Sequence, residues 1–354
     1  MYLNHTNPKR PLLTVTSRKR PDQRDDVMGR CGPEGGLIMA SHSITHVPVM
    51  AEHALELLRV RPNGVYVDAT AGGGGHSLCI ARRLDGGVLV ALDRDPEAVA
   101  SVKKRLADFP CAKVFKANYS EIDEVLARAA IETVDGVLFD LGVSSMQLEA
   151  ARRGFSFQAD GPLDMRMDTS APVDAATWLA NAGRAEIIRA LRDFGDVGPA
   201  ARIADKIIER RQKNRMKRTM DLAEAVADAL DFVSGTPAEV RTVFQAVRMV
   251  VNEELKHLEA GLRAARALLA PAGRIVVITF HSGEDRMVKQ LFRGWTRPEI
   301  LLSADGRVIE KRAPLMRQVT RKPVLPGPDE TERNPRSKSA KMRVVERMAP
   351  ETMK

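Results

Sequence analysis

The chain has 354 residues, of which 44% are hydrophobic, so it can form one large domain or two modest ones with a buried core. No apolar run reaches the roughly 18 residues of a membrane span, and the N-terminus lacks the apolar centre of a signal peptide, which predicts a cytoplasmic protein without membrane partners. The net charge of +9 favours a polyanionic partner, and three cysteines without metal-ligand spacing argue against a metal site or a disulfide framework.

Residues 1–40 are polar, rich in proline and basic side chains, and without apolar periodicity. This composition predicts a disordered basic extension. Met28 and Met39 both precede the first periodic segment, and a start at Met39 would leave a compact protein. An upstream start codon wrongly chosen and an RNA-binding arm both remain open.

From His46 onward, short β-rich runs alternate with helical stretches. The pattern is typical of βαβ units and predicts an α/β domain with a parallel sheet, whose first part spans residues 41–149. The expected strands are Val65–Val67, Val88–Leu92, Lys113–Phe115, Val137–Phe139 and Arg274–Thr279.

More than 100 residues separate the fourth expected strand from the fifth. Since ordinary crossovers are shorter, residues 150–238 are expected to form an inserted helical domain, and residues 239–354 to complete the sheet domain and end in a basic tail, Arg333–Arg343. Apolar residues recur at spacings of three and four from Val240 to Leu262, which predicts one long helix leading back to the sheet.

The segment from Asp68 to Ser77, DATAGGGGHS, follows the first apolar strand. A glycine-rich turn lets the backbone approach a ligand, and an acid at the end of the next strand, Asp93, can accept both hydroxyls of a ribose, so we expect a nucleoside ligand. Ser77 replaces the third glycine of the dinucleotide fingerprint. Asp68 could hold an ammonium group, which favours S-adenosylmethionine over a pyrophosphate.

Four motifs together resemble the bacterial 16S ribosomal RNA cytosine-N4 methyltransferases, over a stretch from about His46 to Arg347. The motifs are the glycine turn with His76-Ser77, the segment Phe139–Ser145, the irregular segment Arg153–Asp168, and Phe280–Ser282 with Glu284–Arg286. The resemblance implies a class I S-adenosylmethionine-dependent methyltransferase, with a Rossmann-like sheet interrupted by a helical substrate-binding domain. It also implies methylation of the N4 amine of a decoding-centre cytosine of 16S rRNA. Naked RNA, the small ribosomal subunit and an assembly intermediate all remain open as the substrate. A monomer and a homodimer both remain open.

The same resemblance implies a set of cofactor-binding residues: Gly74, Gly75, His76, Asp93, Tyr119, Asp140 and Gln147. The glycine amides and His76 would line the methionine end, Asp93 the ribose, and Tyr119 would pack on the adenine. The chain departs from the family pattern at Met146, where proline is common, at Gly283, where leucine is usual, and within the turn itself.

Transfer to an exocyclic amine depends mainly on positioning, and a carboxylate that accepts one N–H favours the nucleophilic form of the amine. Asp140, at the end of the fourth strand, is our candidate for this role, with Asp164 or Asp168 as a second choice. His281 could act near the target base. The alternative is a loop histidine ahead of a helix, with Ser282 as its N-cap.

Candidate RNA contacts lie in two places. Phe155 and Phe157 could stack an extruded base or could anchor the irregular segment. Arginines within Arg202–Arg218 could contact phosphates or could form an ordinary solvated helix face. The candidates among them are Arg210, Arg211, Arg215 and Arg218.

Two other classes of function stay open on the sequence. A nicotinamide-dependent dehydrogenase would use a similar turn, but it should carry the third glycine. A non-catalytic RNA-binding factor on a degenerate methyltransferase scaffold would explain the charge, but it should have lost the acids Asp68, Asp93 and Asp140, which are present.

Overall fold

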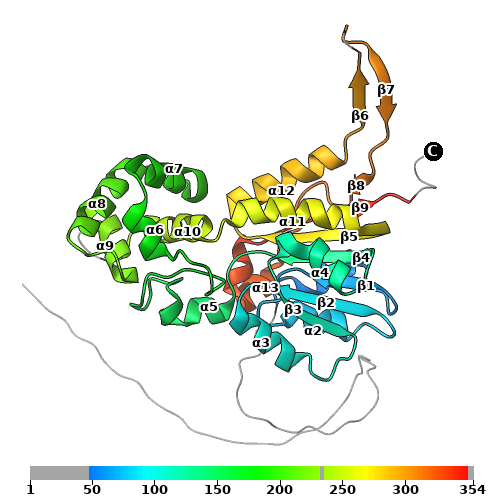
Figure 1. Cartoon of the computed structure of the whole chain (residues 1–354), viewed down its shortest axis with the longest axis horizontal. Coiled ribbons are helices and arrows are strands. Elements are labelled where there is room, and N and C mark those ends of the chain that lie inside the picture. Colours follow the sequence, from blue (N-terminus) through cyan, green and yellow to red (C-terminus); the bar gives the residue numbers. More distant parts are fainter. Residues whose placement is uncertain (1–47, 232–234, 304, 350–354) are drawn as a thin grey trace, which may run out of the picture. The chain divides into compact units, whose positions relative to one another are not determined.

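The computed structural model describes residues 48–231, 235–303 and 305–349, and Figure 1 shows their elements in chain order. The extension expected over residues 1–40, with both early methionines, lies outside the described residues. No helix in the described part of the chain is long and apolar enough to cross a membrane.

A seven-stranded sheet forms the centre of the fold, in the order β3-β2-β1-β4-β5-β9-β8. Its strands are β1 (Val65–Asp68), β2 (Val88–Asp93), β3 (Ala112–Lys116), β4 (Val134–Asp140), β5 (Leu269–Thr279), β8 (Met316–Gln318) and β9 (Lys341–Arg347). Strands β1 to β5 are parallel, which confirms the strands and the α/β class expected from the apolar runs. These runs are apolar on both faces because helices cover both sides of a parallel sheet.

Two helical layers cover the sheet. One contains α1 (Ala51–Leu58), α2 (Gly75–Ala81) and α3 (Pro96–Arg105), and the other contains α4 (Ile122–Arg128), α11 (Glu254–Leu268) and α12 (Ser282–Trp295). The alternation along β1 shows this division, because Tyr66 packs with the first layer and Val67 with the second. The short elements are η1 (Tyr119–Glu121), α5 (Ser145–Glu149), η2 (Ala151–Arg153), α13 (Pro328–Arg333) and η3 (Pro335–Ser339), and a separate hairpin contains β6 (Glu299–Leu302) and β7 (Val308–Arg312).

A second group of helices has its own hydrophobic core and appears as one cluster in Figure 1. Its members are α6 (Ala175–Asn181), α7 (Arg184–Gly195), α8 (Ala200–Gln212), α9 (Thr219–Ala229) and α10 (Glu239–Val251). Leu163 and Met165, from the irregular segment before α6, are buried in the same core. This helical group includes α10, which lies beyond the boundary expected at residue 238.

The return to the sheet uses two helices, so the single long helix expected from the periodicity is wrong. Asn252 and Glu253 separate α10 from α11, and Glu253 has a left-handed φ of 46°. The side chain of Asn252 accepts from the amide of Met167 at 2.8 Å and donates to the carbonyl of Met165 at 2.7 Å. These bonds anchor the break to the irregular segment, which periodicity alone cannot show.

The expected basic tail, Arg333–Arg343, is also wrong. Its last residues belong to β9, which pairs antiparallel with β5. Met342 is buried in the core, while Arg343 donates to both carboxylate oxygens of Asp285, at 2.6 and 3.1 Å. Lys341 and Arg343 belong to this strand, whose apolar residues are buried, and Arg343 has a partner on α12. Arg333 lies on α13 and Arg336 on η3.

Candidate functional site

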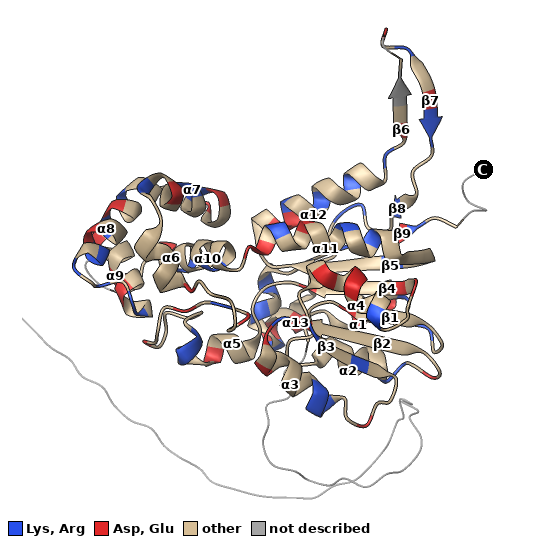
Figure 2. Cartoon of the chain, in the orientation of Figure 1, with Lys and Arg blue, Asp and Glu red and all other residues tan. Residues whose placement is uncertain are grey.

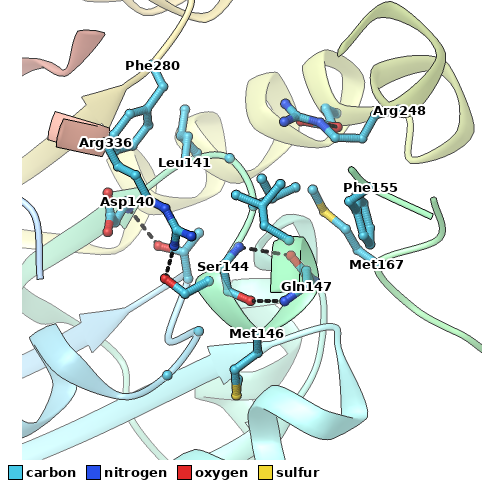
Figure 3. A pocket seen from close by; sticks show the side chains of 18 of the residues that line it. Asp140, Leu141, Ser144, Met146, Gln147, Phe155, Met167, Arg248, Phe280 and Arg336 are labelled. Carbon is cyan, nitrogen blue, oxygen red and sulfur yellow. Dashed lines mark hydrogen bonds and ion pairs between the residues drawn. The ribbon is translucent and has the colours of Figure 1, made fainter. Parts of the chain in front are cut away.

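A cavity of about 890 Å³ lies at the carboxyl ends of the parallel strands, and Figure 3 shows part of its wall. Residues that follow β1, β2, β3, β4 and β5 line it, together with side chains from the irregular segment and from α10. This is where open α/β sheets hold ligands. The expected cofactor residues that line it are Gly75, His76, Asp93, Tyr119, Asp140 and Gln147.

The glycine turn connects β1 to α2 through two left-handed residues, Gly72 with φ 51° and Gly74 with φ 79°. Gly74 is the N-cap of α2 and is not among the residues that line the cavity. A Cβ at Gly74 would meet the side chain of Arg105 at 3.1 Å, and one at Gly75 would meet Pro48 at 3.0 Å. The glycines are therefore required by the backbone conformation and by close packing. Gly74 was expected at the cavity, but the structure does not bring it there.

Asp93 ends β2 and holds the turn in place. Its Oδ2 accepts from the amide of Gly72 at 2.7 Å, and its Oδ1 accepts from the amide of Asp95 at 2.9 Å. Burial raises the pKa of Asp93 to about 6, against the lowering effect of these two hydrogen bonds. A carboxylate on the cavity wall with further lone pairs can accept from the hydroxyls of a ribose.

Asp68 does not reach the cavity, so the expectation that it holds an ammonium group is wrong. It is fully buried beneath the turn, where the hydroxyl of Ser77 donates to its Oδ2 at 2.5 Å and the amide of Thr70 donates to its Oδ1 at 3.3 Å. Burial raises the pKa of Asp68. Ser77, which stands in place of the third glycine, therefore binds Asp68, the acid that ends β1.

His76 and Asp140 face one another across the cavity wall, with 3.4 Å between Nε2 and Oδ2. Both ring nitrogens of His76 and Oδ1 of Asp140 are buried without a hydrogen-bond partner among the described residues. Burial opposes protonation of His76, but the neighbouring Asp140 and Asp68 outweigh it and raise the pKa of the imidazole. Such groups need polar partners, which a ligand in the cavity can supply.

Asp95 does not line the cavity, but it holds the wall residue Gln147, and the sequence reasoning missed it. Its Oδ1 caps α3, and its Oδ2 accepts from Nε2 of Gln147 and from Nη1 of Arg153, each at 2.8 Å. Gln147 is buried, and its Oε1 accepts from the amide of Ser144. The Asp-Pro step before a helix could have indicated the cap, but nothing in the sequence indicates the partners more than 50 residues away.

Tyr119 lies on η1, and its ring meets that of Phe139 edge to face, with 5.7 Å between the ring centroids. Burial raises its pKa. Ala117, Leu141 and Leu258 add apolar surface to the same cavity. This surface suits a flat heterocycle such as adenine.

The second-choice acids do not line the cavity. Both oxygens of Asp164 accept from the guanidinium of Arg166, at 2.7 and 2.8 Å. Asp168 lies 3.0 Å from the ammonium of Lys116 and accepts from Ser170. Asp164 and Asp168 thus stabilise the irregular segment, and the structure does not bring them to the site.

His281 itself caps α12, so Ser282 is not the N-cap. Its Nδ1 accepts from the amide of Glu284 at 3.4 Å, and its Nε2 lies 3.0 Å from the carboxylate of Glu284. Burial opposes ionisation of Glu284, but His281 and Arg248 outweigh it and lower the pKa of this carboxyl. His281 lines the cavity and is both a cap and a wall residue.

Phe155 and Phe157 both line the cavity. Phe155 is buried, with the guanidinium of Arg153 over its ring at 5.7 Å, and Phe157 packs edge to face on Phe244 of α10 at 5.4 Å. The two rings therefore anchor the irregular segment and also present apolar surface to the cavity.

The basic stretch Arg202–Arg218, which runs from α8 to the start of α9, is largely neutralised, and Figure 2 shows basic and acidic residues interspersed over α7 to α9. Arg210, with a side chain only 12% exposed, pairs with Glu224 and Asp228. Arg211 donates to the carbonyls of Leu179 and Ala182 at the end of α6, at 2.8 and 2.7 Å. Arg215 pairs with Glu224, but 60% of its side chain remains exposed. Arg218 pairs with Asp160, and 55% of its side chain remains exposed.

Comparison with known proteins gives consistent matches over nearly the whole described chain. The profile of the MraW methylase family matches residues 43–348. A ribosomal RNA small subunit methyltransferase H from Aromatoleum aromaticum is 46% identical over 304 residues, which cover 85% of this chain and 96% of that protein. Proteins of the same name from Thioalkalivibrio sulfidiphilus and Carboxydothermus hydrogenoformans are 45% and 44% identical over 309 and 313 residues, covering 86% of this chain and 98% of each relative.

Proposed function

The chain belongs to the MraW methylase family, whose methyl donor is S-adenosylmethionine, and on this basis we propose that it methylates small-subunit ribosomal RNA. More specifically, we propose transfer to the exocyclic N4 amine of a decoding-centre cytosine of 16S rRNA. The observation that carries the assignment to small-subunit ribosomal RNA is the identity of 44–46% to proteins named ribosomal RNA small subunit methyltransferase H over almost their full length. The proposed cytosine and its N4 amine rest on the four sequence motifs. Membership of this family sets the dehydrogenase alternative aside.

The residues of the cavity fit S-adenosylmethionine. His76 offers buried ring nitrogens without a hydrogen-bond partner among the described residues, which suit the charged amino-acid end. Asp140 could bind either this end or the acceptor amine. Asp93 offers an acceptor for the ribose hydroxyls, and Tyr119 with Leu141 offers apolar surface for the adenine. When bound, the cofactor supplies an electrophilic methyl group on a sulfonium sulfur.

Asp140 has two possible tasks, and we assign it to the acceptor amine. Its Oδ1 is free within the described residues, while its Oδ2 faces His76 at 3.4 Å. A carboxylate oxygen that accepts one N–H of the amine directs the nitrogen lone pair toward the methyl group. His76 then balances the charge of Asp140 from the opposite side.

The irregular segment positions the acceptor. Its buried residue Arg153 donates to Asp95, which lies two residues after Asp93 at the end of β2. The segment also places Phe155 and Phe157 at the cavity. A base that leaves its stack can enter between apolar side chains of this kind. Arg215 and Arg218 remain the candidates for phosphate contact within the helical group, because their side chains stay exposed.

A methyl-transfer assay tests the proposal. The protein is incubated with methyl-labelled S-adenosylmethionine and with naked 16S rRNA or small subunits, and the RNA is then digested to nucleosides. We expect labelled N4-methylcytidine. A label on another nucleoside would contradict the cytosine assignment, and cofactor binding without any transfer would favour the non-catalytic RNA-binding factor.

Asp140→Asn separates the two tasks of Asp140. If Asp140 acts on the amine, the rate of transfer should fall by about 10²- to 10⁴-fold while the affinity for the cofactor changes little. A large loss of cofactor affinity would instead assign Asp140 to the methionine end.

A further inference from the structure

Two arginines lie at the opening of the cavity, from two different parts of the fold. Arg336 lies on η3, between α13 and β9, and Arg241 lies near the start of α10 in the helical group. Both line the cavity and both are exposed; the side chain of Arg336 is 42% exposed. A residue that lines a cavity and also contacts solvent lies at its rim.

Arg336 is held in place without being neutralised by a buried acid. Its Nη1 donates to the hydroxyl of Ser145, and its Nη2 lies 3.5 Å from Oε1 of Glu149, whose side chain is 72% exposed. Figure 3 shows the guanidinium directed toward this loop, on the side of the cavity that carries Asp140 and Phe280. A long, exposed ion pair contributes little, so the cation remains available to a stronger anion.

Arg241 has no hydrogen bond or ion pair of its side chain within the part of the chain that the structure describes. The other three arginines on the cavity wall each donate to a main-chain carbonyl or to a buried carboxylate of the fold. Arg94 donates to the carbonyl of Asn252 and Arg105 to the carbonyl of Gly73. Arg248 donates to the carboxylate of Glu254. Arg336 donates only to a hydroxyl and pairs with an exposed carboxylate, and Arg241 has no side-chain partner among the described residues, so these two rim arginines are the ones that a phosphate can engage.

We propose that Arg241 and Arg336 are two phosphate anchors that hold the RNA backbone on either side of the acceptor nucleotide. The inference rests on the proposed RNA substrate. A nucleotide drawn out of its stack enters the cavity, while its flanking phosphates stay at the rim, where a planar guanidinium can bind two phosphate oxygens at once. Such contacts fix the register of the strand and carry no sequence information.

The test measures RNA binding as a function of salt for Arg241→Gln, Arg336→Gln and the double variant, with a 16S rRNA fragment that contains the decoding centre. Each lost phosphate contact should reduce the log–log salt slope by about 0.7, and the double variant by about 1.4. Arg333→Gln is the matched control, because Arg333 is exposed on the neighbouring α13 but does not line the cavity. It should leave the slope unchanged.

Three further measurements separate the possible outcomes. Cofactor affinity by calorimetry and thermal melting should stay at wild-type values in both Gln variants, and Arg→Lys at either position should restore most of the slope. An unchanged slope in the double variant would overturn the proposal. So would an Arg336→Gln variant that loses cofactor affinity at an unchanged slope, because Arg336 would then only position the loop of Ser145. Wild-type protein that binds the RNA but transfers no methyl group would contradict the proposed function and would leave the slopes as an independent test of the anchors.

Discussion

The guanidinium of Arg153 donates to Oδ2 of Asp95 at 2.8 Å, and each side chain is only 2–5% exposed. This buried pair joins the irregular segment to the end of β2, and the same guanidinium also donates to the carbonyls of Arg166 and Met167. The segment that brings the aromatic side chains to the cavity is therefore fixed to the strand that carries Asp93.

Arg153→Met should lower the free energy of unfolding by about 3–5 kcal/mol, because the variant leaves Asp95 as a buried acid without its cation. The neighbouring Arg152 is the matched control. Its side chain is 65% exposed and pairs with Glu97, so Arg152→Met should cost less than about 1 kcal/mol. Denaturant unfolding measures both values, and equal losses in the two variants would contradict the anchoring role.

Asp93→Ala should weaken S-adenosylmethionine binding by about 1.5–3 kcal/mol, because the ribose hydroxyls lose a charged acceptor. Calorimetry measures the affinity. Asp108→Ala is the control, since Asp108 is exposed beyond the end of α3 and does not line the cavity. Because Asp93 also accepts from the amide of Gly72, thermal melting is measured in parallel. A lower melting temperature with unchanged affinity would restrict Asp93 to holding the turn.

The affinity for the cofactor should also depend on pH. Burial raises the pKa of Asp93 to about 6, so the carboxyl takes up a proton as the pH falls through that value, and hydroxyl donors favour the ionised form. The contribution of Asp93 to affinity should be constant above about pH 7 and should fall by up to about tenfold per pH unit below pH 6. The pKa of His76 is raised, so its imidazole stays protonated in this lower window. Asp93→Asn should bind more weakly but without this decline, and a decline that persists would assign the titration to another group.

The central part of the fold was predictable because its signals are local. Apolar runs mark the parallel strands, and acids directly after them, such as Asp93 and Asp140, lie at the carboxyl edge by geometry. The break at Asn252 and the strand that contains Arg343 were not predictable in this way. Helical periodicity continues across Asn252, whose partners lie about 85 residues earlier, and Arg343 looks like tail charge until α12 supplies Asp285.

The same limit applies to the site. The motif residues indicated which side chains gather at the cavity, but not how each one is used. Asp68 matched the expected carboxylate for an ammonium group, yet Ser77 binds it beneath the turn. Asp164 lies in the most distinctive motif of the chain, and the guanidinium of Arg166 occupies both of its oxygens. Hydrogen bonds between near neighbours withdrew both acids from the cavity, which residue type and spacing could not show.

The last prediction divides the basic stretch Arg202–Arg218, from α8 to the start of α9, into structural and RNA-binding residues. Arg211→Gln should lower the melting temperature, because two carbonyls at the end of α6 lose their donor, and it should leave the salt dependence of RNA binding unchanged. The double variant Arg215→Gln, Arg218→Gln should keep its stability, since both side chains are more than half exposed, and should reduce the log–log slope by up to about 0.7–0.9 per lost contact. Lys213→Gln is the control for exposed charge, because Lys213 is 62% exposed and pairs with Glu209. The change in slope is divided by the number of charges removed. If this value is the same for Lys213→Gln and for the double variant, the effect comes from the overall positive charge of the protein and not from phosphate contacts at Arg215 and Arg218.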